Sequence, residues 1–456
     1  MTKNDPKKKR PAKAGRDPFP VRPDAVFFLL CFFSILCLLS CFVSFLICFF
    51  SILCLLSCSV SPHSLSLLIL CLLSCSVSPH SLSFLTRMSS FFDCLSMTVD
   101  ADQVSRFRLV YISCVSLCHV LNCQQLIFMA GSLSEIVKAY IRMLRPEISF
   151  MDITLPASAA MLSYYFMTSL TGDPSFPPLI PFLLATIGGY FAITSSYVFN
   201  DCFDVDIDEI NLPDRPLPAG VVSRRSAIIY ASVLAVTSAL ISAWLSIESF
   251  TVLVIAVAVI TLYSWYFKRN TPFSFLPVGV AYGLVPIGIW LAFVPAGILV
   301  PVPEGIPPEY LTSGFFMPLP AIFFGLMICM TDWGFTLAGV CRDVVGDKLR
   351  GAPTLPVTYG IPKTSVFIMI IWIIGIILSM AIGISAKLGP IYFAAALLSG
   401  LWMLRKCYSF IKNPEPALGG KLFVNGSNYR GIMFSAMIID IIVNVLFSSY
   451  HDILWQ

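Results

Sequence analysis

From residue 129 onward, long apolar runs alternate with short polar segments. Each run approaches or exceeds about 20 residues, the length a helix needs to cross the hydrocarbon core of a bilayer. The pattern predicts an all-α, multi-pass membrane bundle of nine transmembrane helices, at residues 149–170, 179–199, 226–246, 249–267, 274–297, 317–339, 365–385, 388–405 and 431–449.

The segment just before the first predicted span, residues 129–148, is amphipathic. Ser132 and Glu135 have the spacing of a capping box, which marks a helix start. The apolar residues that follow share one helical face: Ile136, Tyr140, Met143 and Leu144. The basic residues share another face: Lys138, Arg142 and Arg145. We expect a short helix that lies on the membrane surface.

The first 128 residues have a different character. "CFFSILCLLSC" occurs at 31–41 and again at 48–58, and "LCLLSCSVSPHSLS" at 53–66 and again at 70–83. We interpret this region as a low-complexity repeat segment that is disordered or results from a mis-assigned start or intron, with Met129 as a plausible true start. A targeting region or one or two real spans are the alternatives, although the apolar stretch exceeds the roughly 7–15 residues of a signal core.

Composition supports a membrane protein and excludes several other classes. Charged residues make up 12% of the chain, against about 25% in soluble domains. From Met129 onward there are 18 basic and 19 acidic residues, so nothing indicates a nucleic-acid partner. Twelve of the 16 cysteines precede residue 124 and the rest are scattered, which favours neither a disulfide framework nor a zinc site.

Charge along the chain also predicts an orientation. If the nine spans alternate across the bilayer, one face receives 17 of the 18 Lys and Arg residues after Met129, and only Lys387 lies on the other. Such a bias is typical of the cytosolic face or its topological equivalent. Both acidic stretches described next lie on this basic face, whereas the organelle and the oligomeric state are left open.

Two acidic stretches follow the second and sixth spans. The first, "NDCFDVDIDEINLPDRPLPAG" at 200–220, would place four side chains on one face if the helix continued: Asn200, Asp201, Asp204 and Asp208. The second, "CRDVVGDKLRGAPTLPVTYG" at 341–360, places Asp343, Asp347 and Arg350 on one face. Asp206, Glu209 and Asp214 are interpreted as solvated loop residues.

Clustered carboxylates attract divalent cations, and oxygen-only ligands suit Mg²⁺ or Ca²⁺. An EF-hand is excluded, because Glu209 stands where the loop needs Gly and Arg215 where it needs Glu. Two such clusters facing each other would hold Mg²⁺ around a diphosphate. Basic residues on the same face would neutralise the remaining charge: Lys268, Arg269, Arg215, Arg342, Lys348 and Arg350.

At these residues the chain resembles the UbiA superfamily of intramembrane prenyltransferases over about 135–450. Asn200-Asp201-x-x-Asp204-x-x-x-Asp208 is similar to the first family motif, with "RPLPAG" as its continuation, and Asp343-x-x-x-Asp347 before "KLRGAPTLPV" is similar to the second. "YSWYFKR" at 263–269 resembles the basic loop after the fourth helix. The closest-looking branch holds geranylgeranylglyceryl-phosphate geranylgeranyltransferases and chlorophyll synthases. Val205 differs from the Arg frequent in 4-hydroxybenzoate and haem O enzymes.

The resemblance implies a helical bundle around a central cavity and an Mg²⁺-dependent transfer of a polyprenyl group from its diphosphate to a lipid or aromatic acceptor. It implies metal binding by Asn200, Asp201, Asp204, Asp208, Asp343 and Asp347, of which the last four are the candidate catalytic residues. It implies diphosphate binding by Lys268, Arg269, Arg215, Lys348 and Arg350.

Asp332 lies inside the sixth predicted span, and intramembrane carboxylates favour a functional role. A continuous helix would place it on nearly the same face as Asp343, about 16 Å away, where it lines the cavity or acts on the acceptor. Two other functions stay open: a terpene cyclase that needs no acceptor, and a non-catalytic membrane binding protein or transporter.

Overall fold

The computed structural model describes residues 135–172, 174–311 and 314–446. The predicted repeat segment at 1–128 and the predicted capping residue Ser132 lie outside the described residues. The chain divides into two compact units, of which the second, 128–456, contains everything described here.

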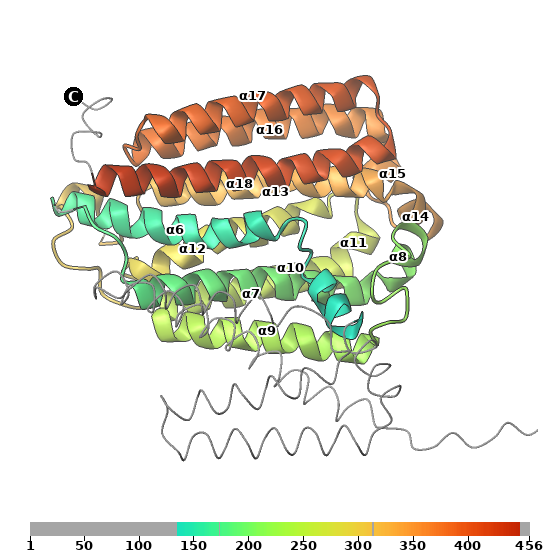
Figure 1. The fold of residues 1–456 in the computed structure, drawn as a ribbon, viewed down its shortest axis with the longest axis horizontal. Helices are drawn as coiled ribbons and strands as arrows, with labels where there is room; N and C mark the ends of the chain where they lie inside the picture. The colour runs from blue at the N-terminus through green and yellow to red at the C-terminus, as the bar shows by residue number, and fades with distance from the viewer. Residues whose placement is uncertain (1–134, 173, 312–313, 447–456) are drawn as a thin grey trace, which may run out of the picture. The chain divides into compact units, whose positions relative to one another are not determined.

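The described residues form a bundle of antiparallel helices (Figure 1). Its long helices are α6 (Ser149–Leu170), α7 (Leu179–Phe203), α9 (Arg224–Leu245), α10 (Ile247–Leu262), α12 (Phe275–Phe293), α13 (Leu319–Arg342), α16 (Ile361–Ser385), α17 (Pro390–Lys412) and α18 (Pro416–Leu446). A π-helix, η1 (Tyr263–Phe267), and α11 (Lys268–Asn270) continue α10. The short elements are α8 (Val205–Asn211), η2 (Pro308–Tyr310), α14 (Val344–Leu349) and α15 (Leu355–Tyr359).

Seven helices in the described part are long and apolar enough to cross a membrane. They are α7, α9, α10 with its continuation to Asn270, α12, α13, α16 and α18. The all-α membrane bundle is thus confirmed. Helices α6 and α17 coincide with the two other predicted spans, but they are not among the seven, so nine spans stay a prediction.

Helix α13 lies at the centre and packs against α12, α16 and α18. Small residues permit the closest approach: a Cβ added to Gly283 of α12 would lie 2.7 Å from the Gly325 carbonyl oxygen of α13. Such contacts are the usual way to pack helices in lipid, where burial from water contributes little between helices. The tight packing fixes α13, and with it the acidic segment at its end.

The last helix differs from its predicted span. Helix α18 begins at Pro416, fifteen residues before the predicted boundary at 431. The extra turns contain Lys421, Asn425 and several glycines, a composition that predicts a loop. They stay helical because their glycine face packs tightly: a Cβ on Gly419 would lie 2.9 Å from the Ala338 carbonyl oxygen of α13.

Residues 135–143 form the helix predicted before the first span. Its apolar face contacts protein, because the ring of Tyr140 lies edge-on to Tyr230 of α9 at 5.1 Å and Met143 is buried. The chain leaves this helix before Arg145, so Arg145 does not share its basic face with Lys138 and Arg142. The position of this helix at a membrane surface stays a prediction.

All the short elements that carry acidic or basic motifs gather at one end of the bundle. Figure 1 shows α8, α11, α14 and α15 together at the right-hand end, and α8 packs against α14. Segments separated by well over a hundred residues in the chain therefore meet there.

Candidate active site

The first acidic motif spans a helix break. Helix α7 ends at Phe203, Asp204 is the junction with φ of −102° and ψ of 5°, and α8 begins at Val205. The expectation that the helix continues without interruption is therefore wrong. The break turns α8 across the end of the bundle, while Asn200 still bonds to Asp204, Nδ2 to Oδ2, at 2.7 Å.

The second motif is built in the same way. Helix α13 ends at Arg342, Asp343 is the junction with φ of −89° and ψ of 5°, and α14 begins at Val344. Asn211 joins the two ends: its Nδ2 donates to the Asp343 carbonyl oxygen at 2.9 Å, and its Oδ1 accepts from the Gly346 amide at 2.9 Å. A Cβ on Gly346 would lie 2.4 Å from Asn211 Nδ2, so a larger residue there would displace the amide that joins the two ends.

The π-helix η1 supplies the third part of the site. Its extra residue per turn displaces the helix locally, a feature often found at functional sites. Ser264 within it donates a hydrogen bond to Asn200 Oδ1 at 3.2 Å. Lys268, directly after it, reaches Asp204 Oδ2 with its Nζ at 2.5 Å.

A cavity of about 110 Å³ opens between these elements. Seven of the predicted site residues line this cavity: Asn200, Asp204, Asp208, Arg215, Lys268, Asp332 and Asp343. The other charged residues of its lining are Arg145 and Arg342. Four carboxylates thus face four cations, which leaves the lining close to neutral.

Each carboxylate of the first motif has a basic partner. Arg215 Nη1 donates to Asp208 Oδ2 at 2.6 Å and to Asp201 Oδ1 at 3.0 Å, and Arg145 Nη2 donates to Asp201 at 2.8 Å. Asp201 is buried behind the cavity lining. Burial raises the pKa of the Asp208 carboxyl to about 6, although Arg215 opposes the shift.

The second motif has fewer partners. Asp343 accepts from the adjacent Arg342, Nε at 2.7 Å and Nη2 at 2.8 Å. Asp347 is buried outside the cavity lining, where Thr354 donates to its Oδ2 at 3.1 Å and its Oδ1 has no hydrogen-bond partner. Burial raises the pKa of Asp347 to about 6, although the positive charge of Lys268 opposes the shift.

Three of the predicted diphosphate-binding residues lie outside the cavity lining. Arg269 pairs with Asp206, Nη2 to Oδ1 at 2.6 Å, in a half-exposed contact. Arg350 donates to the Asp206 carbonyl oxygen at 2.9 Å and reaches Glu209 at 3.4 Å. Lys348 is exposed. Arg269 and Arg350 therefore tie α8 to its neighbours, which also gives Asp206 and Glu209 a structural contact.

A comparison with protein families gives a match to the UbiA prenyltransferase family over residues 160–436, more than half of the chain. The chain belongs to the UbiA prenyltransferase family. It is therefore a membrane prenyltransferase, and the resemblance noted from the two acidic motifs is confirmed.

Relatives of known name agree with this assignment. The chain is 27% identical to the digeranylgeranylglyceryl phosphate synthase of Thermococcus sibiricus over 54% of this chain and 80% of that protein. It is 24% identical to the enzyme of the same name from Pyrococcus furiosus over 65% and 95%. The fold is similar to the apo structure of a UbiA homologue from Aeropyrum pernix K1, with a TM-score of 0.50 and 18% identity over 64% and 97%.

Two residues of this UbiA site were not among the predicted site residues, Arg145 and Asn211. Arg145 has a φ of 53°, a conformation that costs of order 1–3 kcal/mol outside glycine. Its bond to Asp201 and the Tyr197 ring, 4.5 Å away, hold it there. Neither residue has a distinctive spacing, so no local signal in the sequence could have found them.

Asp332 lines the UbiA cavity from the middle of α13. Its Oδ1 pairs with the fully buried Arg430 of α18 at 3.3 Å. Asp440, a second intramembrane carboxylate, instead accepts hydrogen bonds from the backbone amides of Gly389 and Tyr392 at the start of α17. It therefore caps that helix. Only Asp332 of these two faces the site.

The UbiA donor set fits a hard divalent cation. The residues are oxygen donors, and Asp347 Oδ1 is a buried carboxylate oxygen without a partner. Within the described residues, however, no three acidic, histidine or cysteine side chains lie close enough to form a complete metal site. Oxygens from a bound ligand would have to complete the coordination, as suits Mg²⁺ on a diphosphate.

Proposed function

We propose that this chain transfers a polyprenyl group from its diphosphate to a hydrophobic lipid acceptor with the help of Mg²⁺. The observation that carries the proposal is the meeting of two broken helix ends at one cavity. There Asn200, Asp204, Asp208 and Asp343 face Lys268 and the arginines of the lining. The membrane helices provide the apolar surroundings that a polyprenyl chain requires.

Each charged group has a role in binding the diphosphate. Asn200, Asp204 and Asp208 would hold Mg²⁺ at the first helix end, and Asp343 and Asp347 at the second, with Asp201 anchoring Arg145 and Arg215. Bound Mg²⁺ would neutralise charge that develops on the departing diphosphate. Lys268, Arg215 and Arg342 would turn from their carboxylates toward phosphate oxygens, where charge-assisted hydrogen bonds are strong.

The reaction breaks the allylic C–O bond of the donor and leaves a carbocation. Tyr197 and Tyr282 line the cavity with stacked rings 6.3 Å apart, and Tyr263 lies beside Lys268. The faces of such rings attract positive charge. These rings are buried and would shield the carbocation from water. We assign Asp332 to the acceptor side, because it lines the cavity away from the helix ends.

For the acceptor we propose a glycerol phosphate that carries a prenyl ether. The relatives named digeranylgeranylglyceryl phosphate synthase support this class. The free hydroxyl of the acceptor would attack the allylic carbon, forming a C–O bond as its proton leaves. The acceptor and the donor would both enter from the bilayer.

The test uses the full-length chain in proteoliposomes with Mg²⁺, prenyl diphosphates of 5 to 20 carbons and a panel of lipid and aromatic acceptors. We expect diphosphate release together with a prenylated glycerol phosphate. Prenyl hydrocarbons formed without any acceptor would instead identify a terpene cyclase. Binding of the donor without diphosphate release would identify a non-catalytic binding protein.

We further propose that the motif ends of the helices face the cytosol or its topological equivalent. The bias of Lys and Arg residues toward this side supports that orientation. A cysteine placed at the exposed Lys348 should react with a membrane-impermeant thiol reagent from that side only. Labelling from the opposite side would reverse the assigned orientation.

A further inference from the structure

The proposed transfer to a hydroxyl releases one proton, and the residues assigned so far do not account for it. When the acceptor oxygen forms the new C–O bond, it has to give up its hydrogen. The carboxylates at the two helix ends would already be engaged with Mg²⁺ and with the basic side chains around them. Another group inside the bundle therefore has to receive this proton.

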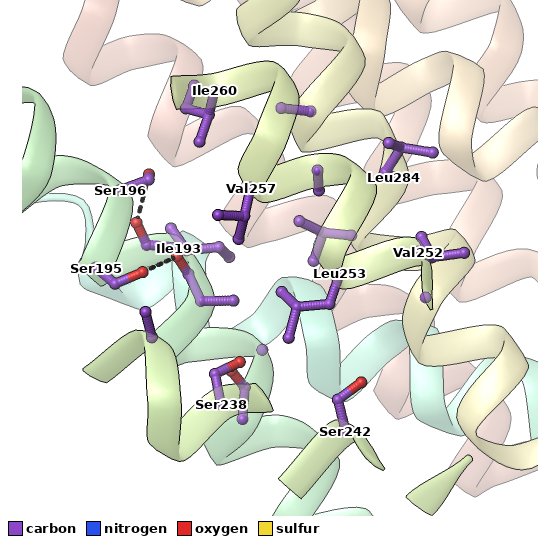
Figure 2. A pocket seen from close by; sticks show the side chains of 18 of the residues that line it. Ile193, Ser195, Ser196, Ser238, Ser242, Val252, Leu253, Val257, Ile260 and Leu284 are labelled. Atoms are coloured by element: carbon purple, nitrogen blue, oxygen red, sulfur yellow. Dashed lines mark hydrogen bonds between the residues drawn. The ribbon is translucent and has the colours of Figure 1, made fainter. Parts of the chain in front are cut away.

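A second cavity, of about 270 Å³ between α7, α9, α10 and α12, offers no such group. Figure 2 shows its apolar lining, with Ile193 on α7 and Leu253 and Val257 on α10. None of its lining residues is a carboxylate or a histidine. Ser195 and Ser196 already donate to carbonyl oxygens of α7 at 2.7 Å. The proton acceptor therefore belongs to the charged cavity.

Four carboxylates of the described residues line the charged cavity, and Asp332 is the one that lies away from the helix ends. It stands eleven residues before Asp343, or roughly 16 Å along α13. Phe335, Thr336 and Gly339 of the same helix continue the lining between them. A diphosphate held at the helix ends would thus leave the reacting carbon and the acceptor hydroxyl between Asp343 and Asp332.

The hydrogen bonds of Asp332 leave one oxygen open to an acceptor hydroxyl. Its Oδ1 accepts from Nη1 and Nη2 of Arg430, both at 3.3 Å. Its Oδ2 accepts only from the Thr336 hydroxyl, at 3.2 Å. A carboxylate accepts about four hydrogen bonds, two on each oxygen, so Oδ2 keeps one position for a further donor.

Arg430 of α18 holds this carboxylate in place. It is fully buried, and its guanidinium carbon lies 4.6 Å from the centre of the Phe335 ring. Within the described residues its Nε has no hydrogen-bond partner, and its side-chain bonds go to Asp332. Its positive charge balances that of an ionised Asp332, which would otherwise be costly to bury.

The other charged groups near this pair have partners of their own. Asp152 of α6 does not line the cavity, and both of its oxygens accept from the Tyr197 hydroxyl at 3.1 Å. Arg145 pairs with Asp201 at 2.8 Å. Asp332 is therefore the carboxylate in the middle of the bundle that an acceptor in the cavity can reach.

We propose that Asp332 is the catalytic base of the transfer and that Arg430 is its positioning residue. This inference rests on the proposed function. The diphosphate leaves with the electron pair of the broken C–O bond. As the acceptor oxygen bonds to the allylic carbon, its proton passes to Oδ2 of Asp332, which becomes a neutral carboxylic acid. The carboxylate is restored when this proton passes to water that enters as the product leaves.

The experiment uses the full-length chain in proteoliposomes with Mg²⁺, labelled geranylgeranyl diphosphate and geranylgeranylglyceryl phosphate, and it measures ether product and released diphosphate together. Asp332→Asn keeps the shape of the side chain but removes the base, so ether formation should fall by about 10²-fold. The ratio of ether to released diphosphate should fall by at least about tenfold. Prenyl alcohol or hydrocarbon should account for the difference, because water capture or elimination then competes for the carbocation.

Variants of Arg430 test its positioning role. Arg430→Gln should lower the same ratio, and Arg430→Lys, which keeps the charge, should recover most of it. The double variant Asp332→Asn, Arg430→Gln buries no unpaired charge and should lower the ratio no further than Asp332→Asn alone. Asp440→Asn, which alters a buried carboxylate outside the cavity, is the matched control and should leave the ratio unchanged. Binding of a non-hydrolysable geranylgeranyl diphosphate analogue shows that each variant is folded.

An unchanged ratio in Asp332→Asn would overturn the assignment and leave the departing diphosphate as the proton acceptor. An equal fall in Asp440→Asn would also overturn it, because the effect would then be general to buried carboxylates. A further fall in the double variant would show that Arg430 does not act through Asp332. If the unaltered chain forms no ether, the proposed function fails and this inference fails with it.

Discussion

The acidic ends of α7 and α13 share one pattern, an aspartate at a helix break with a second aspartate four residues later. Their surroundings differ. At the first end, Asp204 and Asp208 pair with Lys268 and Arg215, which come from other segments of the chain. At the second end, Asp343 pairs only with its neighbour Arg342, and Asp347 has a buried oxygen without a partner.

The first motif is therefore fixed by contacts within the protein, whereas the second keeps a carboxylate oxygen without a partner. Lys268 and Arg215, which come from separate segments, hold the first end in place. A buried polar atom without a partner, such as Asp347 Oδ1, costs roughly 1–3 kcal/mol. We therefore predict that the second end gains more from a bound cation than the first, and four sets of substitutions test this asymmetry.

The largest effect is expected from removing the aspartate at either break. Asp204→Ala and Asp343→Ala should each lower kcat by about 10²–10³-fold, because each removes a carboxylate proposed to hold the Mg²⁺ that would neutralise the departing diphosphate. Diphosphate release from a labelled donor measures the loss. Full Mg²⁺-dependent turnover in either variant would contradict the assignment of both helix ends to the reaction.

The next effect separates two adjacent basic residues. Lys268→Met should lower kcat/KM by about 10²-fold, because Lys268 faces the cavity. Arg269→Met should lower it by less than about threefold, because Arg269 pairs with Asp206 outside the cavity and such exposed pairs contribute little. Donor kinetics on both variants provide the comparison. A larger loss for Arg269→Met would mean that the side chain turns inward when the donor binds.

A smaller effect should distinguish the two ends directly. Asp347→Asn should raise the Mg²⁺ concentration for half-maximal rate by about tenfold, since Asp347 is proposed to hold the ion and its Oδ1 has no partner within the protein. Asp201→Asn should raise this Mg²⁺ concentration less, because Asp201 already pairs with two arginines. Rates measured across a magnesium titration decide between them. Equal increases in the two variants would show that the two helix ends no longer differ once Mg²⁺ and the donor are bound.

The smallest effect is expected at Asp206, which lies between the metal-binding candidates in sequence. Its half-exposed pair with Arg269 is worth at most about 1 kcal/mol. Asp206→Ala should therefore change kcat/KM by less than about threefold, as expected for the loss of the same pair in Arg269→Met, with an unchanged requirement for Mg²⁺. If Asp206→Ala raised the Mg²⁺ concentration for half-maximal rate as much as Asp347→Asn, Asp206 would have to be counted among the metal-binding residues.

Most of the fold was predictable because helices that cross lipid must satisfy their own backbone hydrogen bonds. Long apolar runs therefore indicate the helices almost directly. Helix α18 was predicted to begin too late because its polar first turns are stabilised by contacts with α13. Such contacts between two helices produce no recognisable pattern in the sequence of either helix, so they could not be predicted from it.

The sequence by itself determined the membrane bundle, the two acidic motifs and the diphosphate chemistry that they indicate. Residue type and spacing suffice for these, because charge and hydrophobicity are local properties. The tertiary structure alone decided that both motifs break at an aspartate, that Asn211 joins them and that Arg145 enters the cavity. It also decided that Lys268 and Arg269, adjacent in sequence, face different surroundings. Each of these depends on where distant segments meet, and packing rather than local pattern sets that.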